Sequence, residues 1–165
     1  MRKLTAAAVL VLTAVLAVSC RPEAACPAIA QAPVVSLTVD REYAPSVRAV
    51  HLAACQDGRC KEADLDLVPG STTVDQGCEP GPYGGDGVCS ATSSPDGTLT
   101  GMLMMETLSA SRIEVTATGT DAAGNPLPAR TAAFTPRAAH PFGEQCGTFI
   151  TASVVLDAAG LRQAP

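Results

Sequence analysis

Seven cysteines are the residues whose type and spacing do most to define the chemistry of this 165-residue chain. Cys20 ends a mostly apolar N-terminal segment. The other six are an even number, which in an exported chain indicates a disulfide framework: Cys26, Cys55, Cys60, Cys78, Cys89 and Cys146. No two of them have C-x-x-C spacing, so the sequence predicts neither a thioredoxin-like motif nor a zinc ribbon.

One disulfide can be predicted from local geometry. A two-residue turn at Asp57-Gly58 would make Gln56 and Arg59 the closing pair of a hairpin, and Cys55 and Cys60 would then face each other. Cys78 and Cys89 bracket a Pro/Gly-rich stretch, which favours a disulfide between them. Cys26 and Cys146 then remain for each other, although other pairings stay open.

The N-terminal segment is typical of an export signal. Arg2 and Lys3 precede an uncharged run over residues 4–18, which is short for a membrane span and has the flanks of a cleaved signal peptide. The tetrad Ala17-Val18-Ser19-Cys20 resembles the lipobox of bacterial lipoproteins. That resemblance implies a signal peptide, expected to be helical, over 1–19, lipidation of Cys20 with diacylglycerol and palmitate, and a tether over 20–33. The alternative is a conventional signal peptide that leaves Cys20 as a free thiol.

The net charge of the chain limits the classes of partner that it can bind. The chain has a formal charge of −5, and removal of Arg2 and Lys3 with the signal leaves nine basic and sixteen acidic side chains, or −7. An acidic body disfavours nucleic acid and anionic lipid headgroups as partners. We therefore expect a cell-membrane protein, anchored by lipid on the extracytoplasmic side, whose partner is an unidentified extracytoplasmic protein or a small ligand.

Candidate catalytic residues are few. The chain has two histidines, His51 and His140, and it lacks the G-x-S-x-G signature of a serine nucleophile. His51 lies in a predicted strand, where we expect a polar-facing or hydrogen-bonded role, and His140 precedes a proline in a predicted loop. We predict that the protein is not an enzyme and uses no cofactor.

Two clusters raise the possibility of a metal site. Three methionines could bind Cu(I) through soft thioethers, but their apolar run over 99–105 favours core packing in a central strand: Met102, Met104 and Met105. Three carboxylates alternate along another predicted strand, and we interpret them as a solvated face rather than a Ca²⁺ site because neighbours on one face lie nearly 7 Å apart: Glu62, Asp64 and Asp66.

The elements that must position these residues are predicted to be strands. Alternating apolar residues and frequent turn signals favour an all-β fold, an antiparallel sandwich of about seven to eight strands over residues 34–165. The predicted strands cover residues 34–40, 47–55, 62–67, 87–92, 98–106, 112–119, 130–135 and 147–157. Residues 69–87 are predicted to form an exposed loop, and turns are expected at 94–97 and 137–143.

A family resemblance supports this fold. The segment Ile113-Glu-Val-Thr-Ala-Thr-Gly-Thr-Asp-Ala-Ala-Gly-Asn125 is similar to the late strand and turn of bacterial immunoglobulin-like domains. As a whole, the chain resembles small actinobacterial lipoproteins of unassigned role. The resemblance implies an Ig-like sandwich and no particular activity.

Two functions are therefore expected. The first is a non-enzymatic lipoprotein that binds or supports a partner through residues 69–88 or 136–145. The alternative is a secreted protease inhibitor, because residues 35–39 and 48–52 are similar to the opening strands of small actinobacterial inhibitors of subtilisin-like proteases. In that case Cys78 and Cys89 would brace an exposed reactive loop.

Overall fold

The computed structural model describes residues 25–28, 31–79 and 87–165. The predicted signal helix and Cys20 lie outside these residues. The described chain divides into two units. The smaller contains residues 25–28 and 140–147, including the short 3₁₀ helix η3 (Glu144–Cys146). The larger contains all the strands.

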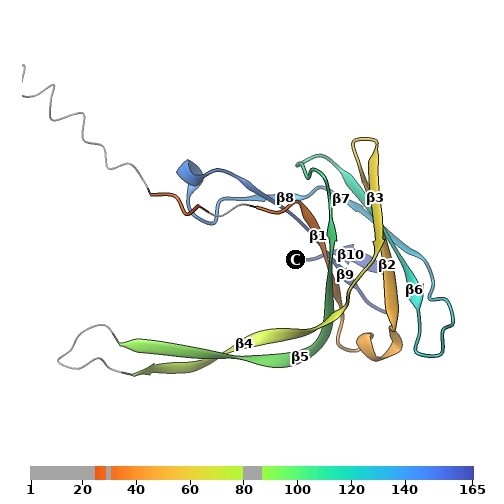
Figure 1. Cartoon of the computed structure of the whole chain (residues 1–165), viewed down its shortest axis with the longest axis horizontal. Coiled ribbons are helices and arrows are strands. Elements are labelled where there is room, and N and C mark those ends of the chain that lie inside the picture. The colour runs from red at the N-terminus through yellow and green to blue at the C-terminus, as the bar shows by residue number, and fades with distance from the viewer. Residues whose placement is uncertain (1–24, 29–30, 80–86) are drawn as a thin grey trace, which may run out of the picture. The chain divides into compact units, whose positions relative to one another are not determined.

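Sheet A, the larger of two sheets, contains six strands (Figure 1). They are β1 (Val34–Val39), β4 (Val68–Glu79), β5 (Val88–Met104), β8 (Arg137–Ala139), β9 (Phe149–Leu156) and β10 (Leu161–Gln163). The order is β10-β9-β1-β5-β4, and β8 also pairs with β9. Strand β1 runs parallel to β9 and antiparallel to β5. The prediction of a purely antiparallel fold was therefore wrong, and sheet A is mixed.

Sheet B contains four antiparallel strands in the order β3-β2-β6-β7. They are β2 (Ala49–Gln56), β3 (Arg59–Asp64), β6 (Ile113–Thr120) and β7 (Arg130–Phe134). A 3₁₀ turn, η1 (Ala44–Ser46), precedes β2. Sheet B corresponds closely to the strands expected from the sequence, although β3 begins earlier than predicted and ends at Asp64.

The two sheets share one hydrophobic core. Strand β1 alternates half-buried and buried residues, β2 does the same from Val50 onward, and the buried apolar residues of both belong to one cluster. Leu37 of β1, Leu52 of β2 and Ile113 of β6 are essentially inaccessible to solvent. Burial of such side chains stabilises the fold by about 1.5–3 kcal/mol each. The prediction of an all-β, two-sheet fold is confirmed.

The hairpin β2–β3 is as predicted. Asp57 and Gly58 both have positive φ, 50° and 77°, as a type I′ turn requires. Gln56 pairs with Arg59, and Cys55 pairs with Cys60 at a Cα separation of 4.1 Å, bridged by a disulfide. The buried amide of Gln56 then binds the segment that joins β5 to β6, through Ser109 and Ser111.

The other disulfides join the pairs expected from the sequence. Cys78 and Cys89 are bridged across β4 and β5 at a Cα separation of 3.9 Å. Cys26 and Cys146 are bridged within the smaller unit at 5.2 Å. Three disulfides indicate an extracytoplasmic domain, because such bonds persist in oxidising compartments. No helix among the described residues is long and apolar enough to span a membrane.

Candidate functional site

The predicted loop over residues 69–87 is wrong, because most of this segment forms a long two-stranded ribbon. Residues 99–104 of β5 pair with β1, and residues 99 and 100 also pair with β4, whereas residues 88–95 pair with β4 alone. We call residues 71–79 and 88–95 the ribbon (Figure 1). Every residue of 71–79 and of 88–93 is exposed, so the ribbon has no core of its own. Sequence patterns missed the strand over residues 71–79 because both of its faces are polar and no apolar alternation marks it, whereas the strand predicted over 87–92 is present as part of β5.

The ribbon joins sheet A at an irregularity in pairing. Pro69 pairs with Leu99 but Ser71 pairs with Pro95, so β5 carries two additional residues here. The predicted turn at 94–97 is thus a bulge within a continuous strand. Gly97 adopts φ of +83°, and the Asp96 carboxylate accepts hydrogen bonds from the backbone N–H and hydroxyl of Thr98. These bonds, the hydroxyl first, lower the pKa of Asp96.

A second irregularity lies near the far end of the ribbon. Asp75 pairs with Ala91 and Gly77 with Ser90, which leaves one additional residue on β4. Gly77 has φ of +87° and donates its N–H to the Asp75 carboxylate at 2.7 Å. Beyond this bulge the Cys78–Cys89 disulfide joins the two strands covalently. An isolated two-stranded ribbon is marginally stable in water, so this crosslink supports its order.

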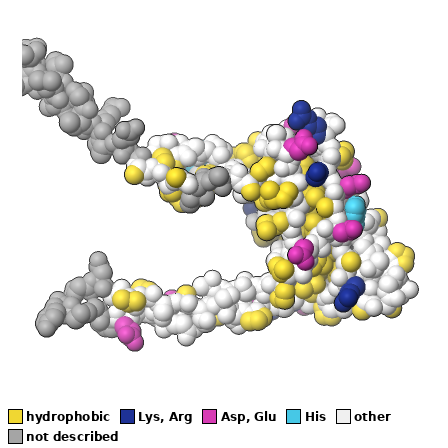
Figure 2. Space-filling model, viewed as in Figure 1, with side chains coloured by type: hydrophobic (Ala, Val, Ile, Leu, Met, Phe, Trp, Pro, Cys, Tyr) yellow, Lys and Arg dark blue, Asp and Glu magenta, His cyan; other side chains and the backbone are white. Residues whose placement is uncertain are grey.

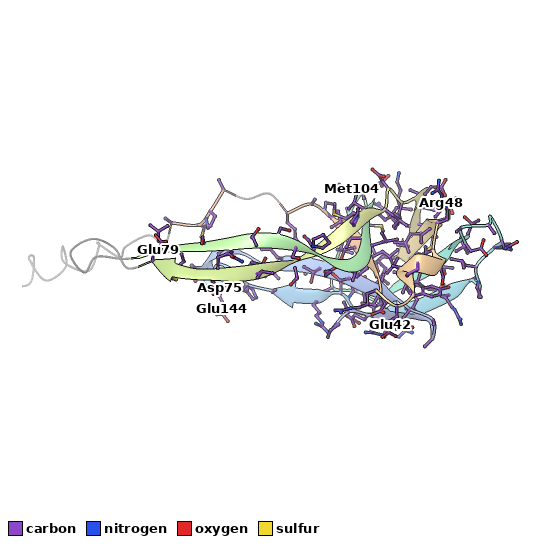
Figure 3. All side chains as sticks on the ribbon, turned by 90° about the horizontal axis from the view of Figure 1, so that it is seen from below. Glu42, Arg48, Asp75, Glu79, Met104 and Glu144 are labelled. Atoms are coloured by element: carbon purple, nitrogen blue, oxygen red, sulfur yellow. A yellow bond between two sulfur atoms is a disulfide. The ribbon has the colours of Figure 1, made fainter. Side chains whose placement is uncertain are left out.

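The ribbon offers hydroxyls, carboxylates and unpaired backbone. No lysine or arginine occurs between residues 68 and 104, and no Lys or Arg colour appears on the ribbon in Figure 2. Asp75 and Glu79 lie on the ribbon (Figure 3). Ser and Thr contribute most of the other polar side chains. Each strand also has an outer edge whose N–H and C=O groups pair with no other described strand, and such edges can accept an additional strand.

His51 forms a second polar cluster, on the outer face of sheet B. Its Nδ1 lies 2.9 Å from Oδ1 of Asp64, and its Nε2 lies 3.8 Å from Oε2 of Glu62. The Asp64 hydrogen bond is the main cause of a raised pKa for His51. The two-residue turn sets this register, because a hairpin closed by Gln56 and Arg59 must place His51 opposite Asp64. The prediction of a hydrogen-bonded His51 is confirmed, and the partner was already implied by the turn.

The three predicted carboxylates do not form one row. Glu62 and Asp64 flank His51, whereas Asp66 follows the end of β3 and lines a groove of about 390 Å³ beside β1 and β5. Among the described residues, no three His, Cys, Asp or Glu side chains are placed to hold a metal ion. His140 lies in the smaller unit, where its Nδ1 is 3.1 Å from the carbonyl of Gly147.

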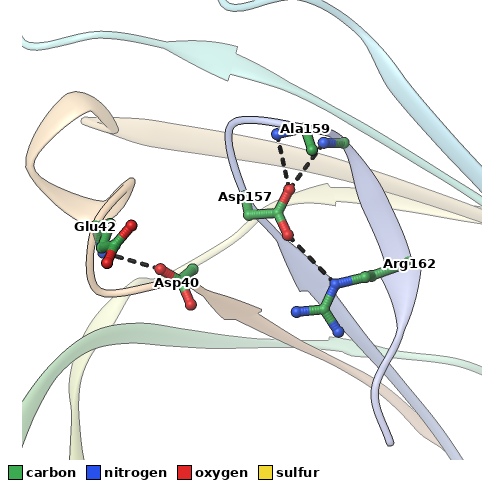
Figure 4. Close-up of polar contacts among 6 residues, drawn as sticks. Asp40, Glu42, Asp157, Ala159 and Arg162 are labelled. Atoms are coloured by element: carbon green, nitrogen blue, oxygen red, sulfur yellow. Dashed lines mark hydrogen bonds and ion pairs between the residues drawn. The ribbon is translucent and has the colours of Figure 1, made fainter.

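Two further hollows are present in the larger unit. One of about 310 Å³ is lined by Gln56, Met105 and the side chains of Arg59, Lys61 and Glu106. The other, of about 560 Å³, is lined in part by Asp40, Glu42 and Asp157 (Figure 4).

The carboxylates that line the second hollow already accept hydrogen bonds from neighbouring residues. Asp157 accepts the backbone N–H groups of Ala159 and Gly160 and the guanidinium of Arg162, while Asp40 accepts the N–H of Glu42. The bond from Gly160 is the largest cause of a lowered pKa for Asp157. These carboxylates therefore stabilise the turns in which they lie.

The methionine prediction is wrong for two of three residues. Met105 is buried, as expected for core packing, but Met102 and Met104 are 67% and 55% exposed. They occupy the outer face of sheet A, while Leu103 between them points into the core. The apolar run over residues 99–105 did not indicate that one face of this strand is exposed to solvent.

The chain was also compared with known proteins. No protein-family model, curated protein or solved structure matches it.

Proposed function

We propose that the chain is a non-enzymatic lipoprotein, anchored through Cys20 on the extracytoplasmic side of the cell membrane, and that its ribbon binds a partner protein. The Arg2-Lys3 start, the apolar run and the Ala17-Val18-Ser19-Cys20 tetrad support the anchor. Pairing of the six described cysteines with one another supports it as well, since none of them is then left to pair with Cys20.

One observation carries the binding role: the ribbon is ordered without burying a core. Fixing each backbone residue costs about 1–2 kcal/mol of conformational entropy. In sheets A and B, burial of apolar side chains offsets that cost, but residues 71–79 and 88–93 are exposed throughout. The Cys78–Cys89 bond lowers the cost by restricting the unfolded chain. A covalently supported, coreless ribbon is well suited to use its surface for contact.

The chemistry of the ribbon defines its partner. With Asp75 and Glu79 and no basic residue, the ribbon favours a neutral or basic surface. Its free edges favour addition of an extended strand, in which backbone hydrogen bonds supply affinity. The Ser and Thr hydroxyls of the ribbon would then contact the partner's side chains. The expected partner is thus an extracytoplasmic protein with an exposed, neutral or basic strand.

The anchor is tested by labelling cells with a radioactive fatty acid. The wild-type chain should incorporate label and remain with the membrane fraction, whereas Cys20→Ala should incorporate none. Cys20→Ala should also be released or stay as an uncleaved precursor. Equal labelling of both chains, or equal release of both into the medium, would contradict the anchor.

The binding role is tested with a photo-crosslinking residue placed at Thr73 or Ser93, which face each other across the ribbon. Glu114, exposed on β6, is the matched control position. In the native cell envelope, Thr73 and Ser93 should yield the same discrete adduct, and Glu114 should yield none. Identical adduct patterns at all three positions would contradict a specific role for the ribbon.

For the sandwich we propose an Ig-like relationship. It is supported by strand β6 leading directly into a turn in which Asp121 accepts the backbone N–H groups of Ala123 and Asn125. The two-sheet core is compatible with that architecture. An experimental structure of the full chain tests the proposal through the order and direction of its strands. A strand order unrelated to Ig-like domains would contradict it.

The alternative of subtilisin inhibition remains a second candidate. Cys78–Cys89 supports it, because the bond braces the end of an exposed hairpin as a reactive loop would require. Titration of the full chain against subtilisin separates the two functions. Stoichiometric loss of protease activity would favour inhibition, whereas full activity with cleavage of the chain would exclude it.

A further inference from the structure

Met102 and Met104 are the two exposed thioethers among the described residues. Buried Leu103 lies between them, so both methionine side chains project into solvent from the outer face of sheet A. On the neighbouring strand β1, Met104 pairs with Val34 and Met102 with Ser36. Met102 also lines the 390 Å³ groove of that face. Neither methionine is needed for the core, which leaves both sulfur atoms open to reagents in solution.

No thiol in the described part of the chain competes with these sulfurs. All six described cysteines are in disulfides. Exposed methionine is then the side chain most readily oxidised, and oxidants reach it directly in an extracytoplasmic compartment. Met105, which is 8% exposed, follows immediately in the sequence and offers an internal comparison.

We propose that Met102 and Met104 form a paired oxidation site that reacts with hydroperoxides and leaves the fold intact. The thioether sulfur attacks one peroxide oxygen, an S–O bond forms and the O–O bond breaks. Sulfur loses two electrons and becomes the sulfoxide, and the peroxide is reduced to water or an alcohol. Sulfoxide reductases reverse this step in general, so the site is reversible.

Oxidation of Met102 or Met104 should also disturb the fold less than oxidation of Met105. A sulfoxide at Met102 or Met104 places its new oxygen in water, and no core contact is lost. The same oxygen at Met105 would be buried without an assured hydrogen-bond donor, which is destabilising. Oxidation of the pair therefore changes the polarity of the outer face of sheet A, including the groove at Met102, while the core of the two sheets is retained.

The test exposes the full chain, with its disulfides intact, to hydrogen peroxide and follows each sulfoxide by peptide mass spectrometry with fragmentation. Met102 and Met104 should each oxidise at least about tenfold faster than Met105. Protein oxidised at the pair should melt within about 2 °C of untreated protein, and a sulfoxide reductase should restore the original mass. A smaller ratio of rates, or a larger fall in melting temperature, would overturn the proposal.

Two variants complete the test. Met102→Leu with Met104→Leu should remove the fast phase of oxidation, whereas Met105→Leu should leave that phase unchanged. Leucine replaces methionine with little change of volume, so both variants should fold. A fast phase that persists in the double variant, or that disappears with Met105→Leu, would also overturn the assignment.

Discussion

Replacement of Gln56 by leucine should be among the most destabilising single changes in the domain. The Gln56 side chain is 6% exposed and makes three hydrogen bonds to the segment between β5 and β6. Its Nε2 donates to the carbonyls of Ser109 and Ser111 at 3.1 and 2.8 Å, and its Oε1 accepts the N–H of Ser109 at 3.0 Å. Leucine keeps the approximate volume and removes all three bonds.

The magnitude follows from the groups left behind. A buried backbone donor or acceptor without a partner costs about 1–3 kcal/mol, but this segment is only half buried and water can reach part of it. We therefore expect Gln56→Leu to lower the free energy of unfolding by about 2–4 kcal/mol, measured by urea denaturation with the disulfides intact. Gln163→Leu is the matched control, because Gln163 makes one exposed hydrogen bond, to the carbonyl of Thr135. Its loss should stay under about 0.5–1 kcal/mol.

Gln56→Glu sharpens the same prediction by adding a pH dependence. A carboxylate at this position would face two carbonyl oxygens and be desolvated, and both effects favour its neutral form and raise its pKa in the folded state. The variant should therefore lose stability as the pH rises above about 4.3, the usual value for glutamate. Equal stability of Gln56→Leu and Gln163→Leu, or a Gln56→Glu variant insensitive to pH, would refute the bridging role of this amide.

The remaining predictions concern the ribbon and His51. A Cβ at Gly70 would lie 1.9 Å from Oγ1 of Thr98, so Gly70→Ala should cost about 1–3 kcal/mol in urea denaturation, and Thr98→Ala should recover part of that loss. Asp64→Asn should lower the pKa of His51 toward 6.5, as followed by imidazole NMR. In the wild type, the stability from this pair is present below pH 6.5 and is lost as the pH rises through the raised value. Serine at both Cys78 and Cys89 should accelerate proteinase K cleavage of the ribbon about tenfold, with under about 1 kcal/mol change in global stability.

Each of these has an outcome that contradicts it. An unchanged Gly70→Ala protein would mean that the bulge adjusts freely. An unchanged His51 titration in Asp64→Asn would mean that the 2.9 Å contact is absent in solution. A large global loss without Cys78–Cys89 would mean that the ribbon unfolds together with the sheets.

What the sequence predicted was local. The hairpin β2–β3, its disulfide and the register of His51 all follow from one two-residue turn at Asp57-Gly58. Apolar alternation likewise predicted the strands that form β1 and β6. In each case the signal and the structure lie within about ten residues of each other, so no tertiary information was required.

What the sequence could not predict depended on distant pairing or on two exposed faces. Nothing local in β1 indicates that it pairs in parallel with β9, more than a hundred residues away. Residues 71–79 of the ribbon carry no apolar alternation, so the Pro and Gly residues of the predicted loop over 69–87 favoured a loop instead. Met102 and Met104 sit among leucines, and only their place on the outer face of sheet A shows that they face solvent.

The central position of β1 in sheet A also constrains the order of events during biosynthesis. Its neighbour β9 ends at Leu156. Because the chain is synthesised from its N-terminus, one side of β1 has no strand to pair with until about 156 of the 165 residues have been made. During that interval the apolar positions of β1 lack half of their eventual sheet. A nascent chain kept extended until export is complete would avoid mispairing at this edge, and folding would then start only after translocation.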